Sequence, residues 1–282
     1  MSFMSFYEKV MAAKDGLSLK KNEECFFRGH TSTNHVLIPS LFRGIDPKMK
    51  VISYDRWYAE RDSFYEFRSR AKEAHLSNFT DWDILFLMQH HLVPTRLLDW
   101  TEHFNVALFF ALLPLFEKKE MPQDFTPCIW LLNPYAMNEK FGYKRELWEP
   151  ENIKFRNVEI KDRGDNENKK EIINLRELYS YGYSEAKDQL FKDVTPIAIY
   201  PSKKGDRITA QGGYFTLHKD DIRPLEMMLN DESILCKLEI PNDPSSLKQA
   251  VDFLMNSGTH FNTLFPDLDG LSKFLNYKYY IR

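Results

Sequence analysis

Three short polar segments set in apolar sequence carry the residues that could do chemistry in this chain. In the first, FFRGH (26–30), Arg28 stands at the end of a predicted buried strand. An arginine there must pair with a carboxylate inside the protein, or face a cleft where it can bind a phosphate, carboxylate or amide. Gly29 would let such a ligand approach the backbone. The alternative is a purely structural arginine–carboxylate pair.

The second segment, residues 89–101, contains two histidines, an arginine, an aspartate and a tryptophan. Arg96 and Asp99 lie three residues apart, and we expect them on a loop or tight turn, where they could pair with each other. Such a pair would clamp the turn against the apolar helix that follows. The functional alternative is a ligand site in which the Trp100 ring stacks on a planar group.

The third segment is RITAQGGYFT (207–216), which alternates as a strand does. Gln211 offers both a hydrogen-bond donor and an acceptor, which suits an amide or a ribose hydroxyl. Tyr214 offers a ring that could stack on a ligand. The two glycines at 212 and 213 predict a bulge or a close backbone approach, so the structural alternative is a hairpin with a bulged turn.

Helices dominate the first half of the chain and strands the second. The absence of a regular strand–helix–strand rhythm favours an α+β fold over a doubly wound sheet. Helices are predicted over 5–14, 53–73, 81–91 (with Thr80 as N-cap), 104–116, 247–258 and the C-terminal segment. Strands are predicted around 24–29, 127–134, 195–201, 208–218 and 233–241. The polar stretch 138–193 reads as a charged insertion in a single domain spanning 1–282.

Composition limits the classes of function. The 282 residues carry a formal charge of -3, so a long nucleic-acid footprint is not expected. Three widely spaced cysteines predict neither disulfides nor a thiolate zinc site. The most apolar stretch (104–116) is too short to span a bilayer, and the N-terminus does not look like a secretory signal. These features predict a cytoplasmic globular protein that does not bind membranes.

Taken in order, several motifs resemble the FRG domain, which is named for its Phe-Arg-Gly motif. They are FFRG, PSLFR (39–43), QHHLVPTRLLDWTEHFNVALFFAL (89–112), RITAQGGYF and LFPDLDGL (264–271). The resemblance runs from about residue 20 to the C-terminus, and 138–193 matches least well.

The pattern is also distantly similar to the ADP-ribosyltransferase superfamily, whose fold is a split, mostly antiparallel sheet with an NAD cleft. This resemblance implies catalytic roles for Arg28, Asp99 and Gln211. It also implies that NAD is the substrate and that no metal takes part. The residues that it implies for nucleotide binding are Arg28, Gly29, Arg96, Trp100, Thr101 and Tyr214. Gln211 departs from the family, which has a glutamate there, and supplies no charge to stabilise a ribosyl cation.

Three hypotheses follow. In the first, the protein is an enzyme that transfers ADP-ribose from NAD to a macromolecular acceptor or hydrolyses NAD, a chemistry suited to a bacterial toxin or phage-defence effector. In the second, it is a non-catalytic module that binds a nucleotide or a protein. In the third, His90 or His91 joins Asp99 and Glu102 in a metal-dependent nuclease or phosphoesterase, although adjacent histidines cannot share one helix face.

Overall fold

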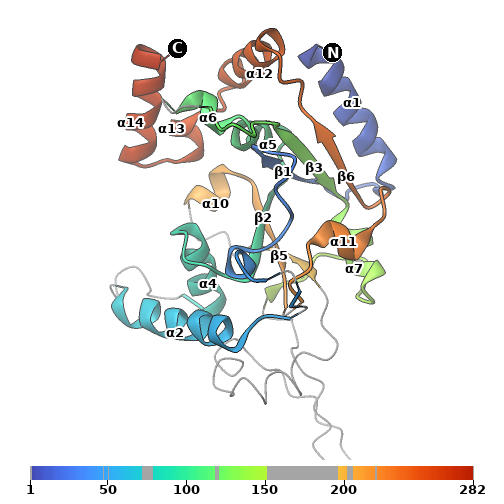
Figure 1. The fold of residues 1–282 in the computed structure, drawn as a ribbon, viewed down its shortest axis with the longest axis vertical. Helices are drawn as coiled ribbons and strands as arrows, with labels where there is room; N and C mark the ends of the chain where they lie inside the picture. Colours follow the sequence, from blue (N-terminus) through green and yellow to red (C-terminus); the bar gives the residue numbers. More distant parts are fainter. Residues whose placement is uncertain are drawn as a thin grey trace, which may run out of the picture.

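The computed structural model describes residues 2–46, 48–49, 51–71, 79–117, 121–150, 196–201, 206–219 and 221–281. These residues form a six-stranded antiparallel sheet with the strand order β4-β5-β2-β1-β3-β6, flanked by helices (Figure 1). The expected α+β class is therefore confirmed. The strands are β1 (Phe26–His30), β2 (Leu97–Thr101), β3 (Cys128–Leu132), β4 (Ile197–Ile199), β5 (Gly213–Leu217) and β6 (Leu235–Glu239).

The sheet is nearly divided between its two central strands. The pairs β1–β3, β3–β6 and β2–β5 each run the full length of the strands, whereas β1 and β2 pair only at Phe27 and Thr101. Beyond that point β1 and β2 separate, and their backbone groups must find other hydrogen-bond partners. The sheet thus consists of two halves, β1-β3-β6 and β2-β5-β4, joined at one residue pair.

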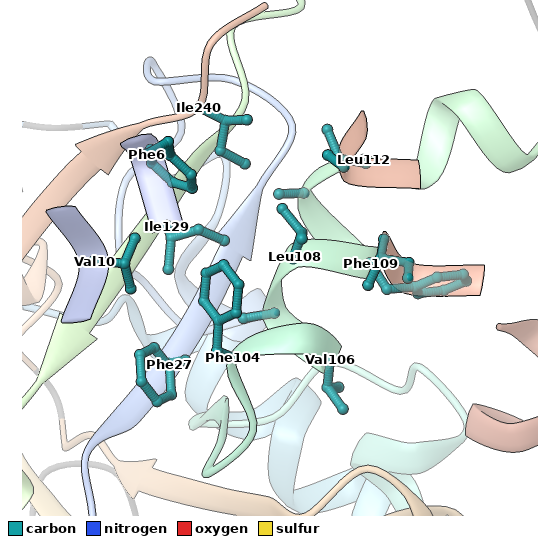
Figure 2. Close-up of a cluster of buried hydrophobic side chains, with 14 of the residues drawn as sticks. Phe6, Val10, Phe27, Phe104, Val106, Leu108, Phe109, Leu112, Ile129 and Ile240 are labelled. Atoms are coloured by element: carbon teal, nitrogen blue, oxygen red, sulfur yellow. The ribbon is translucent and has the colours of Figure 1, made fainter. Parts of the chain in front are cut away.

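The half containing β1, β3 and β6 is covered by an apolar helix, α5 (Phe104–Ala111). Helices α1 (Phe3–Gly16) and α12 (Pro244–Asn256) complete this cover. Because α5 is apolar nearly all round, it can be buried on several sides at once. Figure 2 shows side chains from α1, β1, α5, β3 and the residue after β6 meeting in this core, among them Phe6, Val10, Phe27, Phe104, Leu108, Ile129 and Ile240.

The other half of the sheet is covered by α2 (Tyr54–Arg70) and α4 (Asp81–His90). The N-terminus of α4 carries a capping box in which Thr80 and Asp83 exchange side-chain and backbone hydrogen bonds, as the sequence predicts. Phe86 of α4 stacks on Phe215 of β5, with ring centroids 5.0 Å apart. This contact holds α4 against the sheet beside the gap between β1 and β2.

Shorter elements connect and close these layers. They are η1 (Ser40–Phe42), α6 (Leu113–Phe116), α7 (Pro134–Lys140), α10 (Asp206–Ala210), α11 (Leu225–Leu229), α13 (Phe261–Leu264), α14 (Leu268–Asn276) and η4 (Tyr277–Ile281). In the part of the chain that is described, no helix has both the length and the apolar character needed to cross a membrane. Most of the predicted insertion (138–193) lies outside the described residues, from residue 151 onward.

Two local predictions are wrong. The loop or turn expected around Asp99 is strand β2, which forms because it has a pairing partner on each side. The strand expected from residue 208 begins only at Gly213, because residues 206–210 form helix α10 and Gln211 lies in the turn between them. Both errors concern segments too short for their periodicity to distinguish the structures.

Candidate functional site

A cleft of about 750 Å³ lies over the gap between β1 and β2. Helices α4 and α5 contribute to its walls on the two sides, with β5, α10 and the segment after β1 completing the lining. Its charged lining groups, within the described residues, are Arg28, Arg43, Arg207 and Asp99. Three guanidinium groups to one carboxylate make the cleft suited to an anionic ligand. Apolar surface from Phe86, Phe110 and Phe215 lies beside them.

Arg28 occupies the gap in the sheet. Its Nη1 donates to the backbone carbonyl of Asp99 at 2.5 Å and lies 3.6 Å from the Asp99 Oδ2. The guanidinium thereby satisfies a β2 carbonyl near the point where the two strands part. Burial lowers the pKa of Arg28, the Asp99 charge raises it, and the nearby Arg43 lowers it further. Arg28 is thus a largely buried cation held at the floor of the cleft.

His30 holds the other side of this guanidinium. Arg28 Nε donates to His30 Nε2 at 3.1 Å, and His30 Nδ1 lies 3.2 Å from the carbonyl oxygen of His35. Because a carbonyl can only accept, the proton is on Nδ1 and the ring is neutral. Burial, followed by the charge of Arg28, lowers the pKa of His30 to about 3. His30 therefore acts as a neutral acceptor that fixes the direction of Arg28.

Asp99 presents its carboxylate to the cleft, with 52% of the side chain exposed. Gln89 of α4 donates from Nε2 to the Asp99 Oδ2 at 2.8 Å. The Gln89 Oε1 in turn accepts from the Thr95 hydroxyl at 2.5 Å, which fixes the orientation of the amide. Asp99 is therefore positioned by groups from α4 and β1 while it stays open to solvent.

Position 29 must be glycine because the backbone of helix α5 packs directly against it. A Cβ at this position would lie 1.9 Å from the carbonyl oxygen of Ala107 and 2.7 Å from the backbone nitrogen of Ala111. The close approach predicted for a ligand is thus made by α5, which corrects the reason given for Gly29. The same contact explains why the face of α5 that meets Gly29 carries the small residues Ala107 and Ala111.

Gln211 and Thr101 line the cleft beside Arg207 and are both tied into the fold. The Thr101 hydroxyl donates to the backbone carbonyl of Gln211 at 2.6 Å, and Gln211 Nε2 donates to the carbonyl of Leu264 at 3.0 Å. Leu264 ends α13, so the C-terminal helices orient the Gln211 amide. The carboxamide lines the cleft with one of its two N–H donors engaged.

The structure places Arg96 away from the cleft. Its guanidinium is 1% exposed and forms an ion pair with Glu60 of α2, which is 0% exposed. Arg96 Nε lies 3.0 Å and 2.9 Å from the two carboxylate oxygens of Glu60. Arg96 is taken up by Glu60, while Asp99 contacts Arg28 and Gln89, so Arg96 and Asp99 do not form the expected pair. The ligand-binding role predicted for Arg96 is therefore corrected to a structural one.

Trp100 and Tyr214 contribute to the cleft wall, but their rings belong to a buried cluster. Trp100 Nε1 donates to the Thr216 hydroxyl at 3.1 Å, and the Tyr214 ring packs on Phe26 with centroids 4.6 Å apart. Burial, with Glu102 nearby, raises the pKa of Tyr214 to about 12. Only 3% of Trp100 and 7% of Tyr214 is exposed, so each ring presents little surface to the cleft, and their stacking on a ligand stays a prediction.

Sequence reasoning missed three site residues. His30 adjoins the Phe-Arg-Gly motif, Arg43 ends PSLFR, and Arg207 begins RITAQGGYF. All three lie in the quoted motifs, so their position there was the available signal. No periodicity could have identified them, because a turn and a short helix carry Arg43 and Arg207.

His90 lines the cleft, and burial followed by the charge of Arg207 lowers its pKa. Glu102 lies near the Tyr214 hydroxyl, at 3.4 Å. Among the described residues, no three His, Cys, Asp or Glu side chains come together as a metal site requires. The metal-dependent hypothesis therefore finds no set of ligands in this part of the chain.

These observations define an α+β protein with an antiparallel sheet and a cationic cleft at the central gap of that sheet. Residues 23–120 match the family model of the FRG domain, which is the family that the motifs in this region indicate. The matched region includes β1, β2, α4 and α5, which supply the floor and two walls of the cleft. Neither the curated proteins nor the solved structures contain a match to the chain.

Proposed function

We propose that the cleft binds a dinucleotide of the NAD type and cleaves its bond between nicotinamide and ribose. One observation carries the proposal: Arg28, Asp99 and Gln211, which come from segments far apart in the sequence, line the same cleft of about 750 Å³. This volume is in the range of about 300–1,000 Å³ typical of small-ligand sites.

The charges of the cleft support a phosphate-bearing ligand. Within the described residues, Arg28 donates to the protein from Nη1 and Nε. Its Nη2 group is therefore open to a ligand. Arg43 lies near enough to Arg28 to lower its pKa, so a ligand phosphate between them would relieve the repulsion. The partly buried ring of Phe110 lines the cleft and offers apolar surface for a base or nicotinamide.

Asp99 supplies the carboxylate that Gln211 lacks. When the C1′–N bond breaks, its electron pair stays with nicotinamide and positive charge develops on the ribose. The exposed carboxylate of Asp99 can stabilise that charge, while Gln211 can hydrogen-bond a ribose hydroxyl. Water, or the hydroxyl, amine or carboxylate of an acceptor, then adds at C1′ and releases any proton to solvent. The products are nicotinamide and either ADP-ribose or an ADP-ribosylated acceptor.

A binding module without turnover is the second candidate. It is favoured by the neutral carboxamide of Gln211, which has one of its two N–H donors bound to the carbonyl of Leu264. It is also favoured by the contacts of Asp99 with Arg28 and Gln89, which spread the carboxylate charge over two donors. In this case the cleft would hold a nucleotide while its glycosidic bond stayed intact.

The test combines binding with turnover. Thermal shift and calorimetry with NAD and ADP-ribose are expected to show binding by the wild type and its loss in Arg28→Ala, while chromatography follows release of nicotinamide. Asp99→Asn is expected to keep binding and lose turnover. Arg70→Ala and Asp62→Asn change exposed residues outside the cleft lining and serve as controls.

The outcomes separate the candidates. Binding without nicotinamide release would select the module, and absence of binding to every nucleotide would overturn both. If NAD is consumed, expression of the wild type is expected to slow bacterial growth, as a toxin or phage-defence effector would, and Arg28→Ala is expected to abolish this effect. Toxicity fully retained in Arg28→Ala would contradict the enzymatic proposal.

A further inference from the structure

Arg207 is a cation in the cleft whose role neither the fold nor the reaction explains. It is half-buried on α10 and lines the cleft. Its guanidinium carbon lies 4.1 Å from the centroid of the Phe265 ring, so the group is stacked on an aromatic face. Within the described residues, no carbonyl or carboxylate accepts a hydrogen bond from it and none forms an ion pair with it.

This arrangement differs from that of three other arginines that are buried or half-buried. Arg96 and Arg145 form close ion pairs with Glu60 and Glu23, and Arg28 donates to a carbonyl and a histidine. Buried donors in proteins are normally satisfied, and a guanidinium offers five of them in a planar fork. The stacking holds the plane of Arg207 without using any of its N–H groups.

The surroundings of Arg207 determine what it can receive. The negative charges that act on it are those of Asp267 and Asp99, which raise its pKa against the larger effect of burial. His90, on α4, is held toward its neutral form by burial and by Arg207. A carboxylate or phosphate entering here would meet a cation with open donors beside a neutral imidazole.

We propose that Arg207 forms a second anion subsite, at the α4–α10 side of the cleft, which binds a phosphoryl group of the same nucleotide that Arg28 holds. The inference rests on the proposed nucleotide binding. Asp99 Oδ2 lies 3.6 Å from Arg28 Nη1, and the Asp99 charge also acts on Arg207, so this carboxylate lies near both subsites. A ligand spanning them would place its ribose portion over the Asp99 carboxylate. The phosphoryl group can be the bridging pyrophosphate or a terminal 2′-phosphate.

The experiment measures the dissociation constants of NAD and NADP for the wild type, Arg207→Gln and Arg207→Lys by calorimetry. Removing the charged fork is expected to weaken binding by about 10- to 100-fold. Lysine is expected to recover only part of the loss, because it cannot form the bidentate contact. Arg223→Gln, which changes an exposed arginine paired with Asp221 outside the cleft lining, is expected to bind as the wild type does.

The pattern of loss identifies the phosphoryl group. Equal weakening of NAD and NADP assigns the bridging pyrophosphate to Arg207, and weakening of NADP alone assigns the 2′-phosphate. If Arg28→Ala abolishes binding while Arg207→Gln binds both ligands as the wild type does, the subsite is overturned and the proposed function stands. If the wild type binds neither ligand, both are overturned.

Discussion

Two arginines in short motifs of this chain lie in regions with opposite roles. Arg96, just before β2, is enclosed with Glu60 and is 1% exposed. Arg28, on β1, is 16% exposed and donates to a backbone carbonyl and a neutral histidine at the floor of a cleft. Arg96 is matched by the opposite charge of Glu60 within hydrogen-bond distance, whereas Arg28 keeps part of its donor capacity open. The comparison teaches that the partner of a buried arginine determines whether it stabilises the fold or serves a ligand.

Breaking the Arg96–Glu60 pair is expected to have the largest effect on stability. Glu60→Gln or Arg96→Met leaves one charge buried without its partner, and the free energy of unfolding should fall by about 3–5 kcal/mol. Urea denaturation followed by circular dichroism measures this change.

The double variant Glu60→Leu/Arg96→Met removes both charges and is expected to recover most of the loss. Single variants as stable as the wild type would show that the pair does not hold α2 to β2. The exposed pair of Arg70 and Glu66 gives the contrast, since Arg70→Ala is expected to change stability by less than about 0.5 kcal/mol.

Replacing Arg28 is expected to cost less stability and more binding. Arg28→Met removes the hydrogen bonds to the Asp99 carbonyl and to His30, and about 1–3 kcal/mol of stability should be lost. The variant should stay folded at room temperature and fail to bind NAD. A loss of stability as large as that of Arg96→Met, with nucleotide binding unchanged, would reverse the comparison.

The pH dependence of stability tests how Arg28 is supported. The pKa of His30 is lowered from 6.5 to about 3 in the folded protein. Below pH 6.5 the unfolded chain therefore binds a proton that the folded chain refuses, and stability falls as the pH falls toward 3, by up to about 1.4 kcal/mol per pH unit for this residue.

His218, whose pKa is also lowered to about 3 by burial, contributes a loss in the same direction. His30→Gln, which can still accept from Arg28, is expected to flatten the profile between pH 6.5 and 4 without abolishing it. Denaturation at a series of pH values measures both slopes. An unchanged slope in His30→Gln would mean that His30 can become protonated in the folded state.

Much of the fold could be predicted from local patterns. The helix that begins after Thr80 was predicted from its capping residues, and the helix 104–116 from its apolar content; both are present, the latter as α5 and α6. The motifs around Arg28 and Asp99 indicated the FRG domain, and a family model matches the same region. These features could be predicted because they depend on residues close together in the sequence.

The partners of the site residues were decided by tertiary structure alone. Arg96 and Asp99 are three residues apart, yet Arg96, just before β2, pairs with Glu60 of α2. Asp99 lies within β2, which has a pairing partner on each side, and it faces the cleft. Gly29 is needed because α5 comes back over β1 from 78 residues later in the chain, at Ala107. Residue types establish which groups need partners, but long-range packing determines which partner each group has. It therefore also determines which charges are paired inside the fold and which stay open to a ligand.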